Sequence, residues 1–250
     1  MIRLIDAPSA ELEKICSSDV FGTRIFAYFN TYGAKFDFLK VWLQLGEDET
    51  PLAAISLMDA DMTLTAKENA DFEELRWFIK MTPFSSLQCE RGVMKKLNFT
   101  ESIWGYVVEY KEHLPSESGL VTNNVDFKEM YSLISGVKLL GVGEYLPWLS
   151  DITYRVNHGT ALPGAIYENG TLCACAAALF ITENAALLGA VATQPEYRGK
   201  GFGGTLVKTL GSIMLREGRR AELLCKNDSI VEFYKSVGFF PVGEWAILNN

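Results

Sequence analysis

The chain has 250 residues, of which 48% are hydrophobic and 22% are charged, and its formal net charge is −8. A chain of this length buries about three quarters of its unfolded surface, and it has room for one large domain or two of about 125 residues. The acidic balance argues against a general nucleic-acid-binding protein, because such a protein needs Lys and Arg to neutralise phosphates.

The first half of the chain alternates strand patterns with amphipathic helix patterns. Apolar runs and period-2 alternation predict strands over residues 1–6, 36–45, 51–58, 62–65, 85–89 and 102–110. Helical spacing of apolar residues predicts helices over 9–15, 20–30, 71–81 and 92–97. The segment 113–119 (HLPSESG) has the composition of a linker. We therefore expect a first domain over residues 1–112 and a linker over 113–121.

The second half follows the same order with clearer signals. Helices are predicted over 126–134 and 148–156, and strands over 160–167, 172–182 and 185–193. The dipeptide Asn169-Gly170 between the first two of these strands is a strong hairpin signal. After the glycine-rich segment 198–204 we expect a helix that stops near Gly218, a strand over 221–225, a helix between 227 and 238, and one or two strands over 239–248.

Two diverged copies of one α/β unit account for this order. Leu87-Gln88-Cys89 before Leu97-Asn98-Phe99 parallels Leu224-Cys225-Lys226 before Val237-Gly238-Phe239. The alternative is a coincidence among similar elements. The nearly continuous apolar strands 172–182 and 185–193 indicate a sheet that is covered on both faces. We therefore predict a second domain over residues 122–250.

The cysteines, histidines and apolar runs argue against disulfide-linked, metal-binding, hydrolytic and membrane-spanning proteins. Five scattered cysteines are typical of reduced, buried thiols. With two histidines and no turn-spaced Cys or His pairs, we expect no metal site, and no G-x-S-x-G elbow indicates a hydrolase. We interpret His158 as a loop residue. The start of the chain lacks the pattern of a signal peptide, and the longest apolar run, 172–181, is too short to span a bilayer. We therefore expect a cytoplasmic protein without membrane contact.

The most informative segment holds four glycines within six residues, between a buried strand and a helix. Glycine permits positive φ and a close approach of the backbone to a ligand. The N–H groups at a helix start have no partner within the helix and carry partial positive charge. From Arg198 to Lys226, seven basic residues accompany two acidic ones, a local charge of +5. The pattern indicates a cradle for pyrophosphate; the alternative is a solvated helix with a flexible preceding turn.

The class of phosphate ligand is narrowed by the spacing of the glycines. The segment does not fit G-x-x-x-x-G-K-[ST], which argues against a Walker-type NTPase. Gly199, Gly201 and Gly204 do fit G-x-G-x-x-G, so a Rossmann oxidoreductase is a rival interpretation. The context opposes it, because the loop follows three strands and because Glu222, the nearest candidate for the ribose-binding acid, begins the next strand instead of ending it.

Arg198-Gly199-Lys200-Gly201-Phe202-Gly203 resembles the Q/R-x-x-G-x-G/A acetyl-coenzyme A motif of the GNAT N-acetyltransferase superfamily. The segment 191–197 looks like the family's fourth strand and its exit. Asn227-x6-Tyr234-x3-Gly238-Phe239 has the family's N-x6-Y-x3-G-F spacing. The resemblance covers residues 122–250 in element order and 185–240 in residues. It implies a GNAT fold, with a central mixed, mostly antiparallel sheet flanked by helices, in two tandem repeats.

The resemblance also implies roles for the matching residues. Tyr234 would be the general acid for the departing thiolate, and an amine would attack the thioester directly. The residues implied to bind acetyl-CoA are Val191, Ala192, Thr193, Arg198, Gly199, Lys200, Gly201, Phe202, Gly203, Gly204 and Asn227. Among these, residues 191–193 would contact the pantetheine arm and residues 198–204 the pyrophosphate.

One departure from the family concerns the general base. Many members carry a Glu on the fourth strand, at a position that alignment on the glycine loop puts near Leu187, and residues 185–193 contain no acid. Glu183 would substitute only if the strand were shifted. A water chain or a partly neutral amine would serve instead. The sequence therefore names no base.

The first half resembles a degenerate GNAT repeat. At the place of the glycine cradle it carries Glu68, Asp71, Glu73 and Glu74, which would repel phosphates, and the Asn and Tyr of the second motif are missing. We expect this half to pack against the active half and shape the acceptor site.

The leading interpretation is an N-acetyltransferase that moves an acetyl group from acetyl-CoA to a primary amine of a small molecule or peptide. A non-catalytic acyl-CoA-binding regulator on the same fold is the alternative: the missing acid favours it and Tyr234 opposes it. The sequence does not determine the acceptor, the acyl-chain length or the oligomeric state, for which a homodimer is one option.

Overall fold

The computed structural model describes residues 1–112, 119–139 and 142–250, so most of the predicted linker, residues 113–118, lies outside the described residues. The chain divides into two compact units. We call Met1–Val107, Cys225–Asn227 and Val242–Asn250 the N-terminal unit, and Val108–Leu224 with Asp228–Pro241 the C-terminal unit. The boundaries 1–112 and 122–250 remain a prediction about the repeats.

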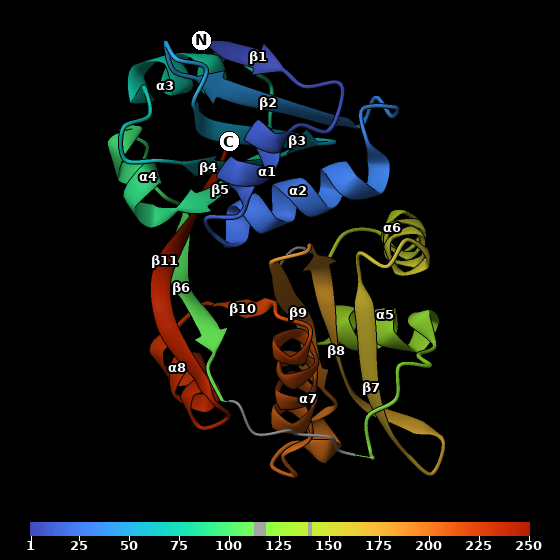
Figure 1. Ribbon diagram of the computed structural model, residues 1–250. Coiled ribbons are helices and arrows are strands. Elements are labelled where there is room, and N and C mark those ends of the chain that lie inside the picture. Colours follow the sequence, from blue (N-terminus) through green and yellow to red (C-terminus); the bar gives the residue numbers. More distant parts are fainter. Residues whose placement is uncertain (113–118, 140–141) are drawn as a thin grey trace. The chain divides into compact units, whose positions relative to one another are not determined.

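The N-terminal unit holds a mixed sheet in the order β1-β2-β3-β4-β5-β11 (Figure 1). Its strands are β1 Ile2–Leu4, β2 Leu39–Leu45, β3 Pro51–Met58, β4 Asp61–Ala66, β5 Ser86–Glu90, most of β6 Ile103–Tyr110, and the end of β11 Phe239–Asn249. Its helices are α1 Ala10–Cys16, α2 Val20–Tyr32, α3 Phe72–Met81 and α4 Arg91–Lys96. Strands β4 and β5 are parallel, whereas the pairs β1–β2, β2–β3, β3–β4 and β5–β11 are antiparallel.

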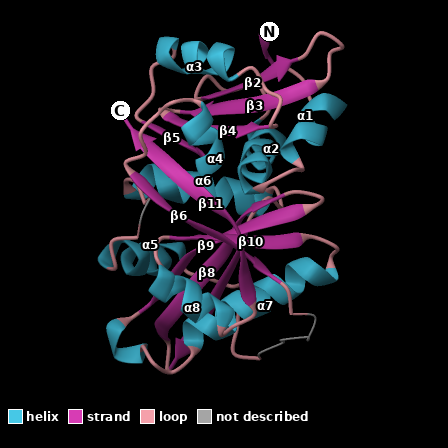
Figure 2. Ribbon diagram, turned by 90° about the vertical axis from the view of Figure 1, so that its left-hand side faces the viewer, coloured by secondary structure: helices cyan, strands magenta, loops and turns pink. Residues whose placement is uncertain are grey.

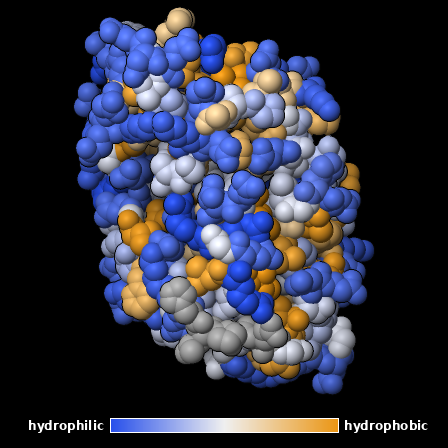
Figure 3. Space-filling view, viewed as in Figure 1, coloured by the Kyte–Doolittle hydropathy of each residue, from blue (hydrophilic) through white to orange (hydrophobic). Residues whose placement is uncertain are grey.

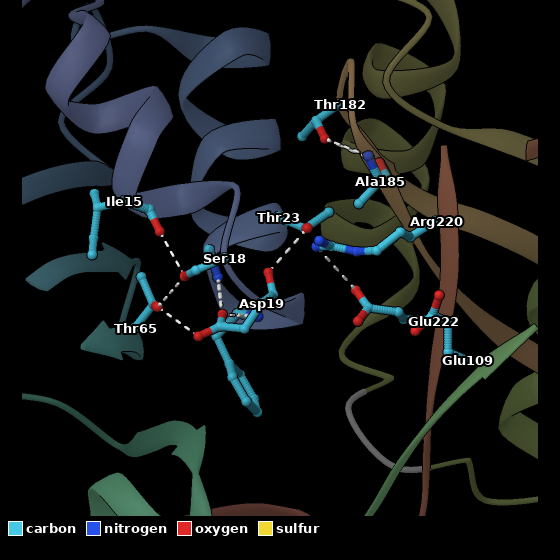
Figure 4. Close-up of polar contacts among 12 residues, drawn as sticks. Ile15, Ser18, Asp19, Thr23, Thr65, Glu109, Thr182, Ala185, Arg220 and Glu222 are labelled. Carbon is cyan, nitrogen blue, oxygen red and sulfur yellow. Dashed lines mark hydrogen bonds and ion pairs between the residues drawn. The ribbon is translucent and has the colours of Figure 1, made fainter. Parts of the chain in front are cut away.

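The faces of this sheet follow from the alternation along β4. Met62 and Leu64 pack in one core cluster with Leu75 of α3. Thr65 points to the other face, where its Oγ1 donates to Asp19 Oδ2 at 2.6 Å (Figure 4). Asp19 also caps α2 by accepting from the backbone N–H of Phe21 at 2.9 Å. The helices α3 and α2 therefore cover opposite faces.

The C-terminal unit holds strands in the order β10-β9-β8-β7. They are β7 Leu162–Glu168, β8 Thr171–Ile181, β9 Ala185–Thr193 and β10 Arg220–Cys225, of which β9 and β10 are parallel. Its helices are α5 Phe127–Gly136, α6 Tyr145–Asn157, the short 3₁₀ helix η1 Pro195–Tyr197, α7 Phe202–Arg216 and α8 Asp228–Lys235. Helices α5 and α7 lie on opposite sides of the strands, as Figure 2 shows.

The predicted mixed α/β fold with helices on both sides of the sheet is confirmed. Asn169 and Gly170 form the predicted two-residue hairpin turn, with φ of 50° and 78°. Helix α6 begins at Tyr145 rather than at 148, because Pro147 fits the first turn, where its missing N–H leaves no bond unmade. The segment 239–249 forms one strand. His158 follows α6, and its Nδ1 lies 2.8 Å from Tyr154 O.

All five cysteines are free and buried. In the ranges that the structure describes, no helix has the length and apolarity needed to cross a membrane, and no three His, Cys, Asp or Glu side chains gather in a way that could hold a metal ion. Hydrophilic residues cover most of the face in Figure 3, with apolar residues scattered among them.

Candidate functional site

The candidate site begins where β9 separates from β10. The parallel ladder pairs Ala185–Leu188 with residues 220–223 and ends there. Beyond it, residues 189–193 pair with β8 and, among the described residues, with no strand on the other side. Unpaired strand edges present backbone N–H and C=O groups that need partners. This edge contains the predicted Val191, Ala192 and Thr193.

A β-bulge lies in the same stretch. Cys175 pairs with Ala192 and Ala177 pairs with Gly189, so two residues of β9 oppose one residue of β8. Ala190 adopts a left-handed φ of 53°, a conformation that costs a non-glycine residue on the order of 1–3 kcal/mol. Cys175 Sγ lies 3.6 Å from Ala190 O, and burial raises the pKa of this thiol to about 12, so the S–H remains available to donate. Bulges often redirect the backbone beside functional sites.

The glycine loop follows η1. Gly199 and Gly201 have φ of 80° and 81°, a region that side chains strain to adopt. Gly201 is the N-cap of α7, and within the described part of the chain no side chain caps this helix. Its first N–H groups are therefore open to an anion.

Gly203 and Gly204 have a different role. A Cβ on Gly203 would lie 3.3 Å from Thr193 Oγ1, and a Cβ on Gly204 would lie 2.9 Å from Val237 Cγ1. Their missing side chains therefore let the start of α7 pack closely against the end of β9 and against the segment after α8. This packing brings the two sequence motifs of the C-terminal unit together.

Two cations flank the loop. Arg198 Nε donates to Thr193 O at 3.4 Å. Lys200 Nζ lies 3.2 Å from Glu168 Oε2 and 4.6 Å from the centre of the Tyr197 ring. Both partners of the Lys200 pair are exposed, and exposed pairs contribute at most about 1 kcal/mol. Glu168 therefore competes only weakly with an anion for Lys200.

Tyr234 lies on α8 and is 6% exposed. Its ring packs edge-on against Phe239 at 5.7 Å between centres, and Phe233 lies 3.9 Å from the position of a Cβ on Gly203. The structure thus places the helix that carries Tyr234 next to the glycine loop. Asn227 belongs to the N-terminal unit, whereas the glycine loop and Tyr234 belong to the C-terminal unit.

Strand β9 carries no acid that could serve as the general base, but a carboxylate lies on the strand next to it. Strand β9 begins at Ala185, and Glu183 stays in the preceding turn, which a bond between Thr182 Oγ1 and Ala185 closes. Leu187 pairs directly with Glu222 of β10, a residue that is 6% exposed. The sequence pattern points only to acids on the strand of Leu187 or, with Glu183, in the turn before it. The parallel pairing of β9 with β10 makes Glu222 a candidate for the general base, because it places this residue next to Leu187.

The C-terminal half matches one protein-family model, described as the acetyltransferase (GNAT) family, over residues 127–239. A search of curated proteins found no match. Several solved structures have similar folds. A GCN5-related N-acetyltransferase from Sphaerobacter thermophilus is 14% identical with a TM-score of 0.61, and the match covers 98% of this chain and 94% of that one.

Two further matches span nearly the whole of this chain. A tandem GNAT protein from the clavulanic acid biosynthesis pathway is 14% identical with a TM-score of 0.54, over 99% of this chain and 97% of its own. A Drosophila protein is 14% identical with a TM-score of 0.65, over 100% of this chain and 98% of its own. At these identities the likeness shows the fold alone. The N-terminal half is consistent with a second repeat of it.

Proposed function

We propose that this chain, whose residues 127–239 match the model of the acetyltransferase (GNAT) family, transfers an acetyl group from acetyl-CoA to a primary amine of a small molecule or peptide. One observation carries the proposal: the uncapped start of α7 opens on two left-handed glycines, beside the unpaired edge of β9. A helix start with these properties suits a pyrophosphate. Acetyl-CoA contains that group and, when bound, supplies an activated acyl carbon.

The residues present fit this co-substrate. Glycines at 199 and 201 leave open space where side chains would stand, since no described residue other than their chain neighbours lies within 4 Å of an added Cβ. Residues 198–204 would hold the pyrophosphate through backbone N–H groups and the two flanking cations. Val191, Ala192 and Thr193 would hold the pantetheine arm through the β9 edge.

Tyr234 would act as the general acid. A phenol keeps its proton near neutral pH and both donates and accepts hydrogen bonds. Edge-on packing against Phe239 holds the ring in place. This proton would go to the sulfur that leaves the acyl carbon.

A non-catalytic acyl-CoA-binding regulator is the second candidate, because Leu187 stands where an acid serves in many GNAT enzymes. The two candidates share the first test, calorimetric binding of acetyl-CoA with NAD as the negative control. Micromolar binding of acetyl-CoA alone supports both, and absence of binding removes both.

Steady-state release of CoA thiol with a panel of primary amines then separates the two candidates. Amine-dependent release supports the transferase. Tight binding of acetyl-CoA without release by any amine supports the regulator.

A further inference from the structure

We propose that Glu222 is the general base of this transfer, and that its carboxylate accepts the proton of the acceptor amine. The inference rests on the proposed function. It fills the role that the sequence of β9 leaves empty, with a residue that lies on the neighbouring strand.

The register of the sheet carries the argument. Glu222 is the direct partner of Leu187 in the parallel β9–β10 ladder. Directly paired residues of neighbouring strands point to the same face of a sheet. The ladder ends one position later, at Leu188 and Leu223. The Glu222 carboxylate therefore lies on the face that Leu187 occupies, at the last positions before the β9 edge becomes unpaired.

The face in question is the one that α5 covers. A Cβ on Gly189 would lie 2.7 Å from Leu179 Cδ1, and Leu179 packs in the core cluster that contains Met130 of α5. Leu187 lies two residues before Gly189 and so shares its face. The bulge residue Ala190 belongs to the same cluster. Glu222 thus faces the side of the sheet on which the bulge and α5 meet.

The charged neighbours of Glu222 suit a functional carboxylate. Arg220 Nη2 lies 3.9 Å from Glu222 Oε2, and Glu109 belongs to β6, the strand next to β10 in the sheet (Figure 4). Glu109 itself pairs with Lys111 at 2.6 Å. Ionised carboxylates are seldom as buried as Glu222 unless they are paired or serve in chemistry, because burial without compensation is costly.

The N-terminal repeat supplies an internal comparison. Its parallel ladder starts with Asp61 opposite Ser86, as the other starts with Ala185 opposite Arg220. Two positions later, Thr63 opposes Gln88. Counted from the start of the parallel ladder, and not by the sequence parallel that aligns Gln88 with Cys225, Gln88 takes the place of Glu222. A neutral amide cannot accept a proton. The repeat without a glycine cradle also lacks the base.

The proton balance is simple. The ammonium form of the acceptor gives one proton to Glu222, which returns it to solvent after turnover. The neutral nitrogen then forms the N–C bond as the C–S bond breaks. The nitrogen loses its second proton, which restores Tyr234 after Tyr234 has protonated the sulfur. The net products are an amide, the free thiol and one proton.

The test compares Glu222→Gln with the wild type on two probe nucleophiles of similar small size. Methylamine is cationic near neutral pH, whereas hydroxylamine is uncharged and needs no base to become nucleophilic. We expect kcat/KM for methylamine to fall by about 100-fold or more, and kcat/KM for hydroxylamine to change by less than about threefold. Equal loss with both probes, or no loss with methylamine, would overturn the assignment.

A second readout needs no turnover. Saturation-transfer NMR should detect methylammonium on the wild-type protein in the presence of CoA and lose the signal in Glu222→Gln. Acetyl-CoA affinity by calorimetry should stay within about twofold, since the glycine loop is untouched. Methylammonium binding that persists in Glu222→Gln counts against the proposal. Loss of acetyl-CoA binding in the wild type would instead remove the proposed function.

Two further variants complete the test. Glu109→Gln is the matched control, because it neutralises a neighbouring, partly buried carboxylate and should leave methylamine turnover unchanged. If Glu222→Gln does not fold, Glu222→Asp keeps the charge on a shorter side chain and should retain a reduced methylamine rate with normal hydroxylamine turnover. If kcat/KM for methylamine fell in Glu109→Gln and not in Glu222→Gln, the general base would be Glu109 and the proposal would be wrong.

Discussion

The helices α3 and α7 hold the same place in the order of elements of the two units, between the third strand of an antiparallel set and the strand that pairs with it in parallel. Their first turns are chemically opposite. Asp71 caps α3 and accepts from the N–H groups of Glu73 at 3.0 Å and Glu74 at 2.9 Å. At α7 the equivalent place is held by Gly201, which has no carboxylate to offer.

The surroundings reinforce the contrast. Glu73 and Glu74 lie in the first turn of α3, whereas Arg198 and Lys200 flank the start of α7. Gln44 Oε1 accepts from the Asp71 N–H at 3.0 Å and fixes the cap further. One fold thus carries one helix start that is satisfied internally and one that is left open. A helix start becomes an anion site only when its own chain leaves the N–H groups free.

The largest effect should come from making α7 resemble α3. Gly201→Asp puts a carboxylate at the N-cap and a side chain at a φ of 81°. We expect acetyl-CoA affinity, measured by calorimetry, to fall by at least about 100-fold, because the charge competes with the pyrophosphate for the same N–H groups.

The matched control for this change is Gly218→Asp. Gly218 has a φ of 77° and open space around its Cβ position, but it follows the other end of α7. It carries the same strain and charge without the cradle, so its acetyl-CoA affinity should match the wild type. If Gly201→Asp and Gly218→Asp bound acetyl-CoA with equal affinity, the glycine loop would not be the coenzyme site.

A smaller effect should follow from Tyr234→Phe, which removes a group that the N-terminal repeat lacks. We expect kcat for thiol release to fall by about 100-fold, the scale of general acid catalysis, while acetyl-CoA affinity stays within about twofold. Tyr110→Phe is the control, since Tyr110 is also buried and its Oη lies 3.2 Å from Ser212 Oγ. That variant should lose about 1 kcal/mol of stability and no turnover. If Tyr234→Phe kept full turnover, Tyr234 would not be the general acid and its ring would serve only in packing.

Local patterns in the sequence predicted several elements of the C-terminal unit correctly. The bounds of β9, 185–193, and the hairpin at Asn169-Gly170 agree with the structure. Both depend on neighbouring residues alone, through apolar runs and turn chemistry. The positive φ of Gly199 and Gly201 follows in the same way from the spacing of glycines.

Features that depend on distant pairing could not be predicted. The bulge at Ala190 leaves no trace in sequence, because alanine carries no preference for a left-handed φ. Glu222 stands beside Leu187 only through the register of β9 with β10, more than thirty residues away. The end of β11 pairs with β5, so Trp245 lies opposite Glu90 in a unit built largely from the first half. Register is set by whole sheets rather than by local patterns.

The smallest effect should come from the reverse change, in which Asp71→Ala opens the start of α3. Loss of the cap should lower the free energy of unfolding by about 1 kcal/mol in urea titrations. Acetyl-CoA should still bind at a single site per chain, because Glu73 and Glu74 keep the first turn negative and no left-handed glycine adjoins it.

Asp126→Ala is the control for this reverse change. Asp126 caps α5 through the N–H groups of Lys128 at 2.8 Å and Glu129 at 3.2 Å, so its loss should destabilise the protein by a similar amount. A second mole of acetyl-CoA bound per chain in Asp71→Ala alone would contradict the comparison. It would show that the cap by itself separates the two repeats, whereas the charges and glycines argue that an open helix start, positive flanks and a left-handed loop are needed together.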